Sequence, residues 1–533
     1  MTNLYINSRK IEQFRQLQQQ LRDRPGTWNE QEQGDCDVLI VPSLSFDQQE
    51  LLKIDGHMYY EERLLCSLIR LHNPQTRLIY LSSLPISPII VEYYLQLLPG
   101  ISFSQVCDRL LLLSAYDNSP IPLTQKILDR PRLLERLQQS LRPGKSYMVC
   151  YNSTVLEREL SNRLGIPALA CDPELLEWGT KSGSRAIFAE CGIPHPQGSQ
   201  LVWTPEDLAE VTAEVWESQP ELQRIVIKLN EGFSGEGNAL LDLRVMPKIA
   251  PGKASHGQRV ATIQAQFANL GFQAVAETWV GFAQKIPLLG AIAEAFIEGE
   301  EKRSPSVQGY ITPRGDVEIL STHDQILGGR DGQIYLGCRF PADENYRLQL
   351  QSLGMKVGQA LAAKGAVERY GVDFVATHLP SGAWDLQAIE INLRKGGTTH
   401  PLMTLKYLTN GYYNPKDGLF YTKQDSQHHS QQPCPKYYIA SDNLQKPQYR
   451  GLLPQDLIDI IAYRNLHFDN SSKTGNVFHL ITALSEFGKV GLTSIGDSLE
   501  QAEAFYAQAI AVLDAETSPD QKISRPTLPK TWV

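Results

Sequence analysis

Residues 371–394, which read GVDFVATHLPSGAWDLQAIEINLR, are the stretch that decides the fold. Two apolar runs flank the turn sequence Leu-Pro-Ser-Gly, so the stretch predicts an antiparallel hairpin. Residues two apart on a strand point to the same face, which puts Glu390 beside Asn392. Asp373, on the partner strand, can share that face. The hairpin therefore predicts two carboxylates and an amide on one side of a sheet.

Three oxygen donors facing one way suit Mg²⁺, a hard cation that prefers oxygen ligands and keeps some of its waters. A carboxylate in an apolar strand also needs a cation close by. Asp385 remains an alternative to Asp373 as the second metal carboxylate. Ion pairs with Arg394 or Lys395 are the competing explanation for these acidic side chains.

A glycine-rich loop, residues 231–238 (EGFSGEGN), follows a predicted strand at 224–230. Its glycines let backbone N–H groups approach a phosphate closely. The loop has no Gly-Lys-Ser/Thr of a Walker motif, and a strand rather than a helix is expected after it. An ordinary hairpin would explain the glycines alone. Lys228 favours phosphate binding, because a lysine inside an apolar strand needs an anionic partner unless it reaches solvent at the strand edge.

Residues 292–297 are predicted to form another strand, which runs into the acidic sequence 298–301. Such a segment can form an adenine slot, in which backbone groups contact the purine and a carboxylate accepts from the ribose hydroxyls. By itself, an ordinary strand with a solvated acidic end is the simpler reading.

The pattern of elements divides the chain into regions of different class. Strands at 37–43, 77–83 and 146–151, with helical patterns at 59–71 and 154–164, predict a parallel α/β domain over residues 1–165. Residues 166–421 have an α+β pattern. The rest of the chain is expected to form a polar linker at 422–436, an α+β module at 437–515 and a loose tail at 516–533. His428 and His429, in the linker, are read as solvated residues rather than as metal ligands.

Composition limits the classes of function. A net charge of −9 with no basic stripe argues against a nucleic-acid partner. The eight cysteines are scattered without any Cys-x-x-Cys pair, which favours reduced thiols over zinc or disulfides. The sequence shows neither an apolar signal core nor a segment long enough to span a bilayer, so no membrane association and a cytoplasmic location are expected.

Taken together, the order of these parts resembles the ATP-grasp superfamily from about Asp172 to Leu405, with Glu-Ile-Asn-Leu-Arg at 390–394 as its most specific piece. The resemblance also covers Lys181 in GTKSGSR (179–185) and the turn CGIPHP (191–196). It implies ATP contacts from Lys181, Lys228, Gly232, Ser234, Gly235, Gly237, Glu294, Phe296, Ile297 and Glu301. It implies metal binding by Asp373, Glu390 and Asn392, with Mg²⁺ or alternatively Mn²⁺ as the ion. It gives catalytic roles to Arg394 and Lys228.

The flanking regions resemble the peptide ligases of the pheganomycin type, which have a pre-ATP-grasp domain, an ATP-grasp domain and a small C-terminal domain. The segments that carry this likeness are residues 42–45, 60–63, 80–86, 323–329, 337–341, 451–452, 474–479 and 491–498. Within them, Arg339 is expected to hold a substrate carboxylate bidentately. His323 is a second candidate for acyl-substrate binding. Structural hydrogen bonding is an equal alternative for both residues.

The resemblance implies a two-step reaction. A substrate carboxylate attacks the γ-phosphate of ATP to give an acyl phosphate, and an amine then displaces phosphate to form an amide. Small-molecule carboxylates and amines, with amino acids or short peptides as the implied kind, would be the substrates, and a homodimer is an expected assembly. Two alternatives remain open: a non-catalytic ATP-binding protein with regulatory or partner-binding functions, and a kinase-like enzyme that stops at a phosphorylated product.

Overall fold

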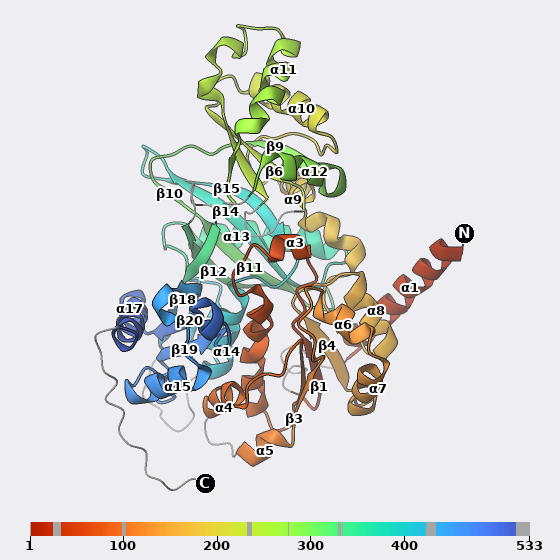
Figure 1. Ribbon diagram of the computed structural model, residues 1–533, viewed down its shortest axis with the longest axis vertical. Coiled ribbons are helices and arrows are strands. Elements are labelled where there is room, and N and C mark those ends of the chain that lie inside the picture. Colours follow the sequence, from red (N-terminus) through yellow and green to blue (C-terminus); the bar gives the residue numbers. More distant parts are fainter. Residues whose placement is uncertain are drawn as a thin grey trace.

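The computed structural model describes residues 2–24, 34–98, 103–231, 237–274, 277–328, 332, 334–422 and 433–518. Figure 1 shows an upper lobe coloured yellow to green, a domain at the lower right in red to orange, and cyan to blue elements at the centre and lower left. Gly232, Ser234 and Gly235 of the glycine loop lie outside the described residues, as do most of the predicted linker and tail.

The N-terminal domain contains a parallel sheet, as predicted. Its order within the described chain is β3-β2-β1-β4-β5, and neighbouring strands run parallel. The strands are β1 (Asp37–Val41), β2 (Arg77–Ser82), β3 (Leu110–Ser114), β4 (Ser146–Cys150) and β5 (Ala168–Leu169). The helices are α1 (Thr2–Arg22), α3 (Gln48–Leu51), η1 (His57–His72), α4 (Pro88–Gln96), α5 (Phe103–Cys107), α6 (Leu123–Leu128), α7 (Pro131–Ser140) and α8 (Val155–Leu164).

Two of these helices show how the sequence sets their form. At α8, Thr154 and Glu157 make a capping box, and Gly165 ends the helix at a positive φ of 67°, a conformation that glycine adopts without strain. The helix predicted at 59–71 is present, but it is a 3-10 helix, η1, that follows Gly56. It buries residues on all sides because it lies between the parallel sheet and the C-terminal elements.

The upper lobe is built on an antiparallel sheet with the order β8-β7-β6-β9. Its strands are β6 (Arg224–Leu229), β7 (Asn238–Asp242), β8 (Gly271–Phe272) and β9 (Ala291–Ala295). The surrounding helices are α10 (Pro205–Ser218), η3 (Leu243–Val245), η4 (Pro247–Ile249), α11 (His256–Gln266), η5 (Phe267–Asn269) and α12 (Trp279–Leu289). The lobe has its own apolar core.

The central sheet has eleven strands in the described part of the chain. They are β10 (Lys302–Arg303), β11 (Pro305–Ile311), β12 (Val317–Gly328), β13 (Ile334–Phe340), β14 (Glu368–His378), β15 (Trp384–Asn392), β16 (Tyr412–Asn414), β17 (Leu419–Tyr421), β18 (Pro435–Gln445), β19 (Gly475–His479) and β20 (Lys489–Gly496). The predicted hairpin of residues 371–392 is confirmed as β14 and β15. The associated helices are η2 (Pro173–Gly179), α9 (Lys181–Glu190), α13 (Arg347–Ala363) and α14 (Thr399–Thr409).

The C-terminal region is joined to the rest of the molecule by this sheet, because β18 pairs antiparallel with β13. Its helices are η6 (Pro447–Tyr449), α15 (Pro454–Tyr463), α16 (Ala483–Phe487) and α17 (Leu499–Glu516). One buried apolar cluster contains residues of both the N-terminal domain and the C-terminal region, such as Tyr94 and Phe478. The boundaries at 165, 421 and 436 stay predictions. Among the described residues, no helix combines the length and the apolar character that crossing a membrane requires.

Candidate active site

A cleft of about 1670 Å³ lies where the upper lobe, the central sheet, the N-terminal domain and the C-terminal region meet. Each of these parts supplies residues to its lining. Lys228 comes from the upper lobe, Asp373 and Glu390 from the central sheet, Tyr60 from the N-terminal domain and Lys489 from the C-terminal region. The size suits a nucleotide together with smaller substrates.

The predicted metal-binding side chains come together in this cleft. Asp373 lies directly opposite Glu390 in the hairpin, beside a bulge that follows Asp373. The Asn392 amide donates to Asp373 at 3.0 Å, and the Gln325 amide donates to the other carboxylate oxygen at 2.7 Å. Burial, followed by repulsion from Glu390, raises the pKa of Asp373 to about 7. The pair therefore favours a nearby cation.

Asp385, the alternative metal carboxylate, lies elsewhere. It sits opposite Thr377 near the turn of the hairpin, and its side chain accepts from Gln387 at 2.8 Å. The geometry thus favours Asp373 over Asp385. Lys395, a possible ion-pair partner of the hairpin carboxylates, instead pairs with Glu368, whose buried carboxylate is 2.7 Å from the lysine ammonium.

The donor set fits Mg²⁺. Two carboxylates and one side-chain amide offer hard oxygen atoms on one face of β14 and β15, and the Asn392 oxygen remains available while its nitrogen holds Asp373. Burial and the neighbouring Glu390 raise the pKa of Asp373, and a bound cation would stabilise the ionised carboxylate. Asp373, Glu390 and Asn392 would hold Mg²⁺, which would supply positive charge for binding nucleotide phosphates.

Lys181 begins α9 and reaches the same face. Its Nζ atom is 2.6 Å from Oε1 of Glu390, and both atoms belong to largely buried side chains. Thr180 caps the helix, and the Ser184 hydroxyl accepts from the backbone N–H of Ile391 at 2.9 Å. The start of α9 is therefore fixed against β15.

Lys228 has an anionic partner inside the chain, which differs from the expectation of a lysine awaiting phosphate. Its ammonium pairs with the carboxylate of Glu294, and both side chains are buried. The Arg185 guanidinium is 3.4 Å from the other oxygen of Glu294. These contacts follow from register, because Val226 of β6 lies opposite Glu294 and Lys228 is two residues further along the same face. Glu294 thus holds two cations beside the cleft.

Of the remaining residues expected to contact ATP, some line the cleft and others, such as Glu301, do not. Phe296 and Ile297 line the cleft, and the Arg224 guanidinium lies 3.9 Å from the centre of the Phe296 ring. Gly237 is buried and lies immediately before β7, the strand that follows the glycine loop. Glu301 pairs with Arg303 at 3.2 Å and is about half exposed, so the structure does not bring it to the cleft lining.

Arg394 and Arg339 both border the cleft. The Arg394 guanidinium lies 5.2 Å from the centre of the Phe46 ring and donates to the Lys395 carbonyl at 3.2 Å. Arg339 is paired with Glu503 of α17 at 2.8 Å. His323 is fully buried beside the Tyr438 hydroxyl, and burial lowers its pKa to about 3. A structural role fits His323 best.

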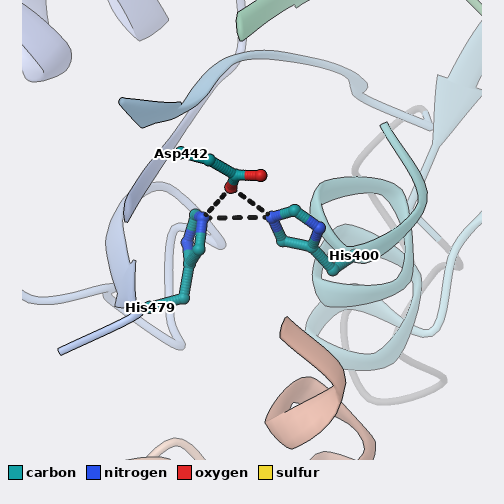
Figure 2. A group of neighbouring side chains, drawn as sticks. All are labelled: His400, Asp442 and His479. Atoms are coloured by element: carbon teal, nitrogen blue, oxygen red, sulfur yellow. Dashed lines mark hydrogen bonds and ion pairs between the residues drawn. The ribbon is translucent and has the colours of Figure 1, made fainter. Parts of the chain in front are cut away.

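Sequence reasoning missed a buried cluster of His400, Asp442 and His479, drawn in Figure 2. The two imidazole Nε2 atoms are 3.0 Å apart, and Oδ1 of Asp442 lies 2.9 Å and 2.6 Å from them. The residues come from α14, β18 and β19, so no spacing in the sequence links them.

This donor set resembles a metal site, but two observations argue for a charge network instead. The other oxygen of Asp442 already pairs with Arg63 at 2.5 Å. In the described structure, Nδ1 of His400 has no hydrogen-bond partner, whereas a metal-bound histidine normally donates from its second nitrogen. Burial lowers the pKa of His400 to about 4, so this imidazole is neutral at neutral pH. The cluster holds Arg63 in place.

Four charged residues connect the upper lobe to the N-terminal domain beside the cleft. Lys53 contacts Glu50 at 2.8 Å and Glu277 at 2.9 Å, and Lys285 contacts the same two carboxylates at 2.7 Å and 2.6 Å. Lys285 lies in α12 and Glu277 just before that helix, whereas Glu50 lies in α3 and Lys53 just after it. We call these four residues the lobe latch.

Residues 173–416, which build the upper lobe and much of the central sheet, are similar to the ATP-grasp family. A family model described as IQCH-like, ATP-grasp matches residues 173–261 and 250–416, and a PGM1 C-terminal domain model matches residues 456–508. The 2-oxoglutarate carboxylase biotin carboxylase domain of Hydrogenobacter thermophilus, solved with MgADP, is similar with a TM-score of 0.52 at 13% identity, over 89% of each chain.

Two curated relatives extend over most of this chain. An L-propargylglycine–L-glutamate ligase of Streptantibioticus cattleyicolor is 28% identical over 485 residues, which is 89% of this chain and 93% of the relative. The IQ motif-containing protein H of Danio rerio is 22% identical over 520 residues, covering 90% of this chain but only 48% of that protein. The chain thus spans about half the length of this second relative.

Proposed function

We propose that the protein is an ATP-dependent carboxylate–amine ligase that joins amino acids or short peptides through an acyl phosphate. The observation that carries the proposal is the face shared by Asp373 and Glu390, with Lys181 at 2.6 Å from Glu390 and Asn392 bonded to Asp373. This arrangement of acidic, amide and basic groups in one cleft suits a metal-bound triphosphate. The relative named as an L-propargylglycine–L-glutamate ligase supports amide formation between amino acids.

ATP supplies the phosphoryl group that activates the acid, and Mg²⁺ (or Mn²⁺) would neutralise its phosphate charge while held by Asp373, Glu390 and Asn392. Lys181 would donate to the same phosphates and keep Glu390 oriented. Phe296 and Ile297 would border the adenine at the end of β9.

The glycine loop connects β6, the strand that carries Lys228, to β7. Lys228 and Glu294 would fix the edge of the nucleotide site as a neutral pair, so Lys228 acts on phosphate only if it moves from Glu294. Arg394 would stabilise the negative charge that develops on the acyl group as the carboxylate reacts and as the amine attacks. Exclusion of water by the closed lobe matters, because acyl phosphates hydrolyse.

Arg339 would contact the acyl substrate at the far edge of the cleft, where it now pairs with Glu503. We also propose a homodimer, to be checked by light scattering of the purified protein. The division into pre-ATP-grasp, ATP-grasp and C-terminal domains belongs to the same proposal.

The test is a screen of amino-acid pairs with Mg-ATP, followed by release of ADP and phosphate and by mass spectrometry of the products. An amide formed with stoichiometric ADP supports ligation. A phosphorylated product without amide would make the enzyme kinase-like, and ATP binding without turnover of any pair would favour the non-catalytic alternative.

A further inference from the structure

Lys489, the first residue of β20, is a buried cation at the C-terminal side of the cleft. Only 2% of its surface is exposed. Its ammonium donates to the Asp55 carbonyl at 3.0 Å and to the Tyr60 hydroxyl at 3.0 Å, both of which are neutral oxygens. None of the ion pairs formed among the described residues includes Lys489. A buried ammonium is costly without a directly paired anion, and Lys489 has none among the described residues.

The pKa of Lys489 reflects that deficit. Burial, followed by repulsion from the nearby Arg63 guanidinium, lowers this pKa to about 8, while Asp442 and Asp55 act in the opposite direction. Arg63 cannot take a second anion as readily, because Asp442 already pairs with it at 2.5 Å. His400 and His479 hold Asp442 from the other side, as Figure 2 shows. Of the two cations, Lys489 is the one left to bind an anion.

A continuous row of side chains connects Lys489 to the proposed reaction centre. The Tyr60 hydroxyl accepts from Lys489, and the Arg63 guanidinium lies 3.6 Å from the centre of the Tyr60 ring. Arg63 also donates to the Tyr151 hydroxyl at 3.1 Å. These contacts make one wall of alternating cationic and aromatic groups.

The wall continues towards Arg394. The Tyr151 ring meets the Phe46 ring edge-on at 6.4 Å, and Phe46 lies 5.2 Å from the Arg394 guanidinium. Four of these wall residues, Tyr60, Arg63, Tyr151 and Arg394, line the cleft together with Lys489. A substrate that reacts at Arg394 can therefore extend along aromatic faces to the ammonium of Lys489.

We propose that Lys489 binds a carboxylate that the substrate keeps, meaning one that is not activated by ATP. This inference rests on the proposed ligase function and gives its substrate class as an amino acid or short peptide that still carries a free carboxylate after the amide has formed. That carboxylate comes either from the acid or from the amine substrate. An anion there supplies the charge missing around Lys489, and the C-terminal region gains a direct part in substrate selection.

The test uses the full-length protein and the amino-acid pair that it joins best. Each substrate in turn is replaced by an analogue in which the carboxylate left out of the new amide is a carboxamide. In the wild type, the substrate that contacts Lys489 should lose about 10- to 100-fold in kcat/KM when its carboxylate is replaced, since a charge-assisted hydrogen bond is lost. The other replacement should have a small effect, which identifies the source of the carboxylate.

In Lys489→Met, the KM of the affected substrate should rise by about the same factor, and the preference for the free acid over the carboxamide should disappear. Lys489→Arg should keep much of that preference and shows that charge, not folding, is responsible. Lys446→Met is the matched control, because Lys446 lies outside the cleft and pairs with Asp514 at 2.6 Å. A preference for the free acid that survives in Lys489→Met overturns the inference while leaving ligation intact.

If no amino-acid pair is joined, the proposed function fails and binding decides the inference on its own. L-glutamate should then raise the melting temperature of the wild type and of Lys489→Arg, but not that of Lys489→Met. Equal shifts in all three proteins, or no shift in the wild type, would contradict a carboxylate site at Lys489.

Discussion

The Nζ atom of Lys181 lies 2.6 Å from Oε1 of Glu390, so that the first residue of α9 and the strand β15 share one ion pair. The two residues are far apart in the sequence, and the resemblance implied ATP binding for Lys181 and metal binding for Glu390. Glu390 also faces Asp373 across the hairpin. The acidic face and the phosphate-binding lysine therefore form one unit in which a change at Glu390 affects both.

Glu390→Gln should lower ATP turnover by about 100-fold or more, because it removes a metal-binding charge and the partner of Lys181. ADP release at saturating Mg-ATP measures this. Asp385→Asn is the matched control on the same strand, since Asp385 lies opposite Thr377, away from the acidic face. Equal losses in the two variants would contradict a special role for the acidic face that Glu390 shares with Asp373.

Glu277→Gln should loosen the lobe latch, because Glu277 contacts both Lys53 and Lys285. The expected result is a rise of about fivefold in the KM for ATP with a small change in kcat, which corresponds to about 1 kcal/mol of closure energy. Steady-state ADP release measures both constants. Glu214→Gln, an exposed residue of the same lobe, should behave as the wild type; a latch variant with an unaltered KM would mean that these ion pairs do not favour the closed lobe.

Asp442→Asn should destabilise the protein by about 3–5 kcal/mol, because it leaves the buried Arg63 guanidinium without its partner. Denaturant unfolding measures the free energy. Asp514→Asn, which breaks a partly exposed pair with Lys446, should cost about 1 kcal/mol or less.

The same cluster gives a separate prediction about metals. Added Zn²⁺ or Co²⁺ should not raise the melting temperature of the wild type, since the Arg63 guanidinium already forms an ion pair with Asp442. A stoichiometric metal in the purified protein that is lost in His479→Ala would overturn the charge-network interpretation of Figure 2.

Binding of the retained carboxylate should weaken as the pH rises through about 8, where Lys489 loses its proton in the free protein. Below this pKa the ammonium is charged and the KM should change little, whereas above it the KM should rise towards about tenfold per pH unit. Tyr60, Arg63, Asp55 and Asp442 face the ammonium and set this midpoint. The KM of the carboxylate substrate, measured from about pH 7 to about pH 9.5, checks the profile. In Lys489→Arg the rise should be absent over this range, and a wild-type profile unchanged by that substitution would exclude Lys489 as its source.

The hairpin and the parallel N-terminal sheet could be predicted from the sequence because local patterns specify them. Residues 371–392 alternate around a clear turn, and the buried strands at 37–43 and 77–83 flank a helical pattern. Strand periodicity placed Glu390 and Asn392 on one face, and the register of the hairpin adds Asp373 to it, opposite Glu390.

The remaining contacts depend on tertiary structure that local patterns do not encode. The pairing of β18 with β13 brings the C-terminal region onto the central sheet, and only then does Lys489 meet Tyr60. The partner of Lys228 likewise depends on the register of β6 against β9, which places Glu294 beside it. Nothing in the sequence around Arg63 indicated Asp442, which is hundreds of residues away in the chain.

Formation of an amide by the purified protein tests the central claim most directly. Wild-type protein with Mg-ATP and the best amino-acid pair should give a product whose mass equals the two substrates minus one water, together with equal amounts of ADP and phosphate. Glu390→Gln should form the amide and release ADP at rates lower by about 100-fold or more. Amide formation that continues undiminished in Glu390→Gln, or ATP consumption that yields only a phosphorylated acid, would contradict the account.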